Sequence, residues 1–110
     1  MDEQVKALLS KYPDQVIELF IKIREIIYGS ISHAPNETLW ARLPSYYVES
    51  NFVRLIPFKD HINIEASQII CHKEKLTGYK ITPKGMLQIY LNDEIPYNTL
   101  KLIFSETLGK

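Results

Sequence analysis

The chain has little of what defines several protein classes. Its only cysteine is Cys71, so it forms neither an internal disulfide nor a metal site made of several cysteines. Its 13 basic and 13 acidic side chains cancel, so no overall field draws the molecule toward nucleic acid or an anionic membrane. No apolar run approaches the roughly 18 residues that span a bilayer. We therefore expect no nucleic-acid partner and no membrane contact.

The remaining composition predicts a single cytoplasmic domain. A length of 110 residues with 45% hydrophobic residues is ordinary for one globular unit, and we assign residues 1–110 to one domain. The first residues, Met1-Asp2-Glu3-Gln4, carry neither a basic leader nor an apolar signal core. We therefore expect the protein in the cytoplasm.

Helical spacing of apolar residues marks both ends of the chain. A short stripe covers Val5–Leu9, and a longer helix is predicted from Asp14 to about Ser30, with Gly29 near its end. Pro96 is suited to open a final helix. The apolar stripe of that last helix consists of Leu100, Ile103, Phe104 and Leu108.

The middle of the chain is typical of strands separated by turns. The predicted strands are Thr38–Ala41, Tyr46–Val48, Phe52–Ile56, His61–Ala66 and Met86–Leu91. Ser67 is placed to cap a short helix that ends near Leu76, and Pro57 makes the strand before it an edge or ends its pairing. Few connections are long enough for parallel crossovers. The sequence thus predicts an α+β fold: an antiparallel sheet of about five strands with the N-terminal and C-terminal helices on one face.

An ordered succession of motifs runs through this strand region. The motifs are Leu43-Pro44-Ser45-Tyr46-Tyr47, Pro57-Phe58-Lys59-Asp60-His61-Ile62, Tyr79-Lys80-Ile81-Thr82-Pro83-Lys84-Gly85-Met86-Leu87-Gln88-Ile89 and Ile95-Pro96. Over roughly residues 14–108 the chain resembles the YdhG-like family of small bacterial proteins. The resemblance implies a stand-alone α+β domain of largely unknown function, and some members are described as frataxin-like intracellular iron chaperones. The chain departs from the family at Leu43 and Asn63, where glycine is usual.

The turn before the last strand has the composition of an anion site. Lys80 and Lys84 lie between Gly78 and Gly85, and ammonium groups and turn amides both favour a carboxylate or phosphate. The alternative is a solvated turn that only aligns the strand.

Further candidates for binding are aromatic or histidine side chains. His61, beside Lys59, has the chemistry for metal binding or proton transfer, although a lone histidine more often makes a structural hydrogen bond. Trp40 is expected to pack in the core. For Tyr46 the pattern leaves core packing and a pocket wall equally open.

No pattern indicates catalysis or a resident cofactor. Cys71 is expected to be a small buried hydrophobe, and His33 and His72 to lie at the surface. We find no activated nucleophile, phosphate loop or paired acid and base, and so expect no enzyme. Iron is expected from the family resemblance alone. The helix that would carry an acidic ridge alternates acids with bases, at Asp14, Glu18, Lys22, Arg24 and Glu25.

The sequence therefore predicts a non-enzymatic domain that binds a small anionic ligand. The candidate ligand-binding residues are Tyr46, Lys59, His61, Lys80 and Lys84. Two alternatives remain, an iron chaperone and a module that binds a protein partner through an exposed strand edge.

Overall fold

The computed structural model describes residues 1–109. Within this range the sheet is antiparallel, with the strand order β1-β2-β3-β4-β6-β5. Its strands are β1 (Asn36–Trp40), β2 (Leu43–Val48), β3 (Asn51–Pro57), β4 (His61–Ala66), β5 (Lys80–Ile81) and β6 (Leu87–Tyr90). The helices are α1 (Glu3–Leu9), α2 (Asp14–Gly29), the 3-10 helix η1 (Ile70–Leu76) and α3 (Tyr97–Leu108). The α+β class predicted from the sequence is confirmed.

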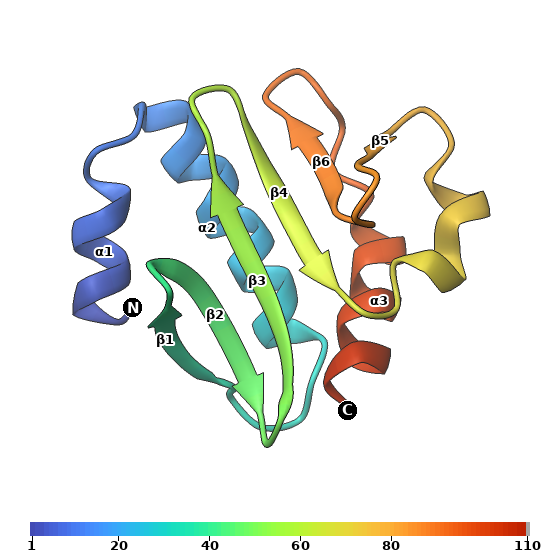
Figure 1. The fold of residues 1–110 in the computed structure, drawn as a ribbon, viewed down its shortest axis with the longest axis horizontal. Helices are drawn as coiled ribbons and strands as arrows, with labels where there is room; N and C mark the ends of the chain where they lie inside the picture. The colour runs from blue at the N-terminus through green and yellow to red at the C-terminus, as the bar shows by residue number, and fades with distance from the viewer. Residues whose placement is uncertain (110) are drawn as a thin grey trace.

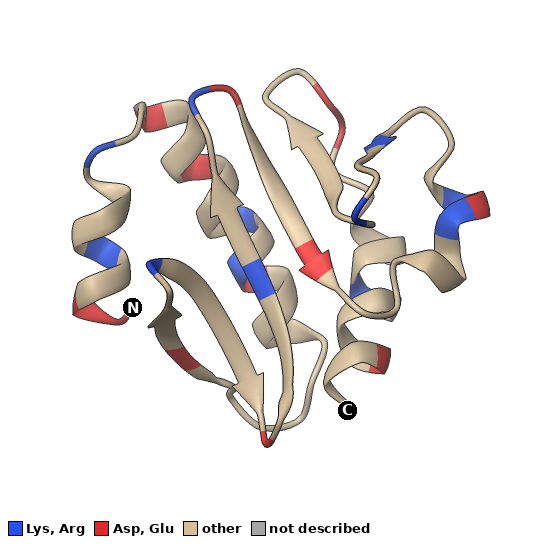
Figure 2. Cartoon of the chain, viewed as in Figure 1, with Lys and Arg blue, Asp and Glu red and all other residues tan. Residues whose placement is uncertain are grey.

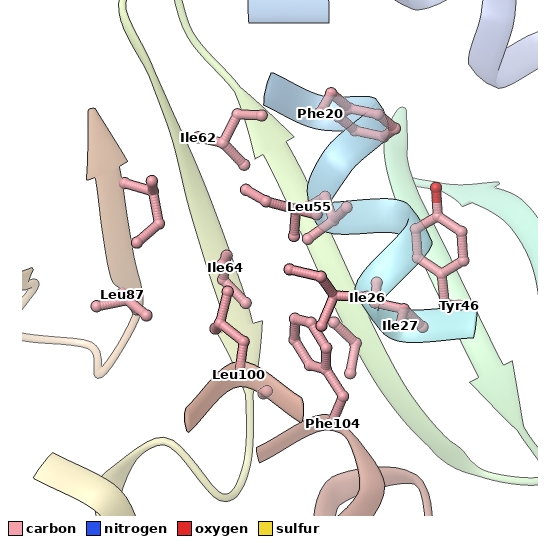
Figure 3. Packing of buried hydrophobic residues seen from close by; sticks show 14 of the residues in the cluster. Phe20, Ile26, Ile27, Tyr46, Leu55, Ile62, Ile64, Leu87, Leu100 and Phe104 are labelled. Atoms are coloured by element: carbon pink, nitrogen blue, oxygen red, sulfur yellow. The ribbon is translucent and has the colours of Figure 1, made fainter. Parts of the chain in front are cut away.

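Two layers make up the molecule. Helices α2 and α3 lie against one face of the sheet, and α1 lies beside the edge strand β1 (Figure 1). Phe20 of α2, Phe104 of α3 and Leu55 of β3 are fully buried between the layers (Figure 3). Residues 1–109 place no helix across the opposite face, which is turned toward the viewer in Figure 1. We call it the open face.

Strand alternation decides which side chains reach each face. Tyr46 lies opposite Val53, and both are fully buried on the helix side. One residue along, Arg54 lies between Ser45 and Glu65 in the register and belongs to the open face. The open face is therefore occupied by the residues that an amphipathic strand normally gives to solvent.

The sheet has one strand more than the sequence indicated. Strand β5 is only two residues long and falls in the segment interpreted as a turn, because two residues are too few to show a period. Pro57 ends β3 at its register position opposite Ile62. Since β3 lies between β2 and β4, the expectation that Pro57 marks an edge strand is wrong, and the expectation that it ends the pairing is confirmed.

Three burial predictions are wrong. Trp40 is 53% exposed, because alternation turns Leu39 toward the core and Trp40 toward the open face. Cys71 is exposed, because η1 buries Leu76 alone among its own residues. The His72 side chain is only 11% exposed, since its Nε2 lies 2.7 Å from Oε1 of Glu106 on α3.

Within residues 1–109, no helix combines the length and the apolar character needed to cross a bilayer.

Candidate functional site on the open sheet face

Three rings stand side by side on the open face, where β3 turns into β4. The ring centroids of Phe58 and His61 are 4.5 Å apart with an angle of 3° between their planes. The centroids of His61 and Tyr90 are also 4.5 Å apart, at 23°. The stack forms because His61 lies directly opposite Tyr90 in the register, while the Phe58 N–H donates to the His61 carbonyl across the turn at 2.9 Å. We call Phe58, His61 and Tyr90 the ring stack.

A lysine lies next to the ring stack on the far side of Tyr90. The Nζ of Lys80 is 5.2 Å from the Tyr90 ring centroid, within range of a cation–π interaction. Lys80 reaches this position because β5 pairs with β6 and sets it opposite Gln88. The Gln88 amide in turn donates to Asn63 Oδ1 at 3.1 Å. A polar row thus continues from Lys80 across the middle of the sheet.

The contact between His61 and Asp60 determines which imidazole nitrogen carries a proton. Nδ1 lies 2.8 Å from Oδ1 of Asp60, and an ionised carboxylate only accepts, so Nδ1 carries a proton. None of residues 1–109 hydrogen-bonds Nε2 of His61. In the neutral ring that nitrogen accepts, and in the protonated ring it donates.

This geometry is suited to an anion more than to a cation. The edge of an aromatic ring is the positive part of its quadrupole. Protonated His61 adds an N–H donor, and Lys80 adds an ammonium group beside Tyr90. Together these groups can hold a carboxylate, sulfate or phosphate on the sheet surface.

The structure brings some of the predicted site residues together. His61 and Lys80 share the open face through Tyr90, and Lys59 is exposed in the adjoining β3–β4 turn. Lys84 lies in the β5–β6 turn. Because β6 runs antiparallel to β4, that turn is at the opposite end of the sheet from His61.

Tyr46 lies on the other face of the sheet and is fully buried. Its ring meets the ring of Tyr28 on α2 edge-on, with centroids 6.1 Å apart, and its hydroxyl donates to Oε2 of Glu37 at 2.7 Å (Figure 3). Burial, and then the neighbouring Glu37 carboxylate, raise the pKa of the Tyr46 hydroxyl. Of the two possibilities the sequence left open, core packing describes Tyr46, because alternation turns it inward.

A second cluster on the open face was not predicted from the sequence. The guanidinium carbon of Arg54 lies 4.0 Å from the Trp40 ring centroid and 3.8 Å from that of Phe52. We call these three residues the arginine sandwich. Alternation in β3 places Phe52 and Arg54 on one face and would have indicated this pair. Trp40 joins them only through the pairing of β1 with β2 and of β2 with β3.

A groove of about 590 Å³ opens between α2 and the loop after β6. Glu18, Asp60 and Asp93 line it with a single basic residue, Lys22. Tyr90 of the ring stack also lines this groove. The excess of carboxylates is unfavourable for an anion, so the groove itself is not part of the anion site.

Neither metal ligands nor relatives define the site further. Across residues 1–109, no three side chains among His, Cys, Asp and Glu lie close enough together to hold a metal ion. Comparison with family models, with curated proteins and with solved structures finds no match to this chain. The resemblance to the YdhG-like family therefore stays a prediction from the sequence.

Proposed function

We propose that this chain is a non-enzymatic binding protein that holds a small anionic ligand against the open face of its sheet, at the ring stack and Lys80. The observation that carries the proposal is the state of His61. Its ring is fixed between Phe58 and Tyr90 and its Nδ1 is held by Asp60, so Nε2 is left for a ligand. A ring nitrogen that is fixed in advance, and that donates when the ring is protonated, binds an anion with a smaller entropic cost.

The electrostatic surroundings support the same ligand class. Lys80 and Lys59 are both exposed near the ring stack and make no ion pair within the described part of the chain. Asp60 is engaged by His61 at 2.8 Å, and Asp93 is engaged by the Tyr90 backbone N–H, which donates to its Oδ2 at 2.8 Å. The local charge is therefore favourable to an anion although the net charge of the chain is zero.

The two alternative functions have weaker support. Iron handling rests on the family resemblance, and the described residues offer no cluster of metal ligands in its favour. Pairing through a strand edge is disfavoured, since α1 lies beside β1 and β5 offers only two residues.

Sulfate is a suitable probe because its charge does not change near neutral pH. We would titrate sulfate against chloride at constant ionic strength and follow backbone and side-chain amides by NMR. We expect saturable shifts centred on His61, Gln88 and Tyr90, with affinity lost about tenfold in His61→Gln and Lys80→Gln. Phosphate and benzoate titrations would then separate tetrahedral from planar anions.

Two control variants make the result specific. Lys101→Gln removes another lysine near an aromatic ring, with Nζ 6.0 Å from the Tyr97 centroid on α3, and should leave sulfate binding unchanged. Lys84→Gln should also leave it unchanged, because Lys84 is at the other end of the sheet. Shifts that do not saturate, or that weaken equally in all four variants, would rule the proposal out.

A further inference from the structure

We infer that the tip of the β1–β2 hairpin, formed by Trp40, Ala41 and Arg42 above Arg54, is a docking surface for an acidic segment of a partner protein. It is a different part of the open face from the ring stack. The inference goes beyond the proposed anion site and stands independently of it.

Trp40 is exposed yet held in place. Arg54 is only 5% exposed, and its guanidinium packs on the Trp40 and Phe52 rings. Its donors are engaged by Ser45 Oγ at 3.1 Å, Tyr47 OH at 2.9 Å and Glu65 Oε1 at 3.4 Å. The indole therefore rests on a fixed support while 53% of Trp40 faces solvent. An exposed tryptophan that is already ordered has the character of an interface hot spot.

The turn beside Trp40 has an unfavourable backbone conformation for the residues that form it. Ala41 and Arg42 have φ values of 50° and 65°, in the left-handed region that glycine and asparagine tolerate best. The tight turn keeps Trp40 opposite Leu43, which sets the indole over Arg54. It also displays Arg42, an exposed residue two positions after Trp40 in the sequence. Backbone strain retained at a tip with an exposed tryptophan and arginine is consistent with a binding role.

Charge selects the kind of partner. Glu65 is paired with Arg54, and Glu37 is turned inward to Arg24 and Tyr46. Arg42 has no ion pair among the residues that the structure describes. Figure 2 shows blue at the β1–β2 turn and midway along β3, and red on β1, at the β2–β3 turn and at the end of β4. An unpaired cation on the same hairpin tip as an exposed indole is complementary to a carboxylate flanked by apolar side chains.

The test uses two synthetic peptides. In the first, Asp and Glu alternate with Leu and Phe; in its twin, Lys replaces each acid. Fluorescence polarisation of the labelled peptides with the intact chain should show tighter binding of the acidic peptide, weakening as salt is added. Trp40→Ala and Arg42→Ser should each reduce that affinity about tenfold or more. Arg42→Ser changes only an exposed side chain, so it keeps the test valid even where Trp40→Ala disturbs Arg54.

The chain offers a matched control for each variant. Tyr97 on α3 is also 53% exposed and also has a cation over its ring, that of Lys101. Tyr97→Ala and Lys101→Ser should therefore leave peptide binding unchanged. The inference is overturned if the lysine twin binds equally well or if the control variants lose as much affinity. Sedimentation that shows self-association dependent on Trp40 would replace the partner with a second copy, and tighter binding of a labelled oligothymidylate would replace it with nucleic acid.

Discussion

The guanidinium of Arg24 on α2 and the carboxylate of Glu37 on β1 form a paired contact, with Nε 2.6 Å from Oε2 and Nη2 3.1 Å from Oε1. The carboxylate also accepts from the Asp2 backbone N–H and the Tyr46 hydroxyl, both at 2.7 Å. One side chain thus ties the start of α1, the middle of α2 and two strands together. A buried carboxylate is tolerated here because each of its oxygens has charged or dipolar donors.

Glu37→Gln should lower stability and its dependence on acid. Burial alone would raise the pKa of Glu37, but the hydrogen bonds from Arg24, Asp2 and Tyr46 outweigh it and lower that pKa. A lowered pKa gives stability that is present above the ordinary carboxyl pKa and lost as pH falls through the folded-state pKa. We expect urea unfolding at pH 7 to show a loss of about 1.5–3 kcal/mol.

The same variant should also lose less stability than the wild type between about pH 4.5 and pH 3. Glu18→Gln, on an exposed residue of α2, serves as the control and should unfold like the wild type at both pH values. If the free energy of unfolding falls equally with pH in the wild type and in Glu37→Gln, Glu37 does not have a lowered pKa in the folded protein.

Trp40 is the only tryptophan, so its fluorescence reports directly on the arginine sandwich. We expect emission typical of an indole in contact with water and efficient quenching by acrylamide, because 53% of the residue is exposed. Arg54→Met should raise the quenching toward that of the unfolded chain, since the guanidinium covers one face of the ring. Emission at short wavelengths with little quenching would instead place Trp40 in the core.

The double substitution Ala41→Asn with Arg42→Gly should stabilise the protein. Both positions have positive φ, and Asn-Gly is the favoured sequence for this two-residue turn. We expect a gain of about 1 kcal/mol in urea unfolding, after allowing for the added freedom of glycine in the unfolded chain.

The control for the turn is Lys59→Gly, at an exposed residue of the β3–β4 turn that does not have positive φ. It should destabilise the protein slightly, because glycine only adds unfolded-state entropy there. If the inferred docking surface is correct, the stabilised double variant should also lose binding of the acidic peptide. Stability and binding would then change in opposite directions.

Sulfate binding at the ring stack should strengthen as pH falls. Acid favours the imidazolium form, in which His61 presents a positive N–H donor at Nε2, whereas the neutral ring with its proton on Nδ1 presents only a lone pair there. The charged or titratable groups around it are Asp60, Tyr90 and, beyond Tyr90, Lys80. NMR titrations at pH 5.5 and pH 8 should show the change in the wild type and its loss in His61→Gln. Equal affinity of the wild type for sulfate at both pH values would show that protonation of His61 does not contribute to sulfate binding.

Local patterns were sufficient to predict most elements of the fold. The stripe in α2 places Val16, Phe20, Ile23 and Ile27 on one side, and all four are fully buried. The alternation in His61–Ala66 coincides with β4. These predictions hold because periodicity and burial are linked within a single element. The two-residue strand β5 has no such period, and it became visible only through its pairing with β6.

The candidate sites depended on pairings between distant segments. His61 and Lys80 come together because β4, β6 and β5 lie side by side, whereas Tyr46 lies on the far face although it seemed an equal candidate. Trp40 and Arg54 are 14 positions apart in sequence and meet across two strand pairings.

The sequence by itself determined the helices, most strands and the α+β class, because each follows from local spacing or composition. Only the tertiary structure decided which face each ring and cation occupies and which of them touch. A shift of one residue in strand register moves every side chain to the other face, so contacts across the sheet are settled by long-range pairing and not by local pattern.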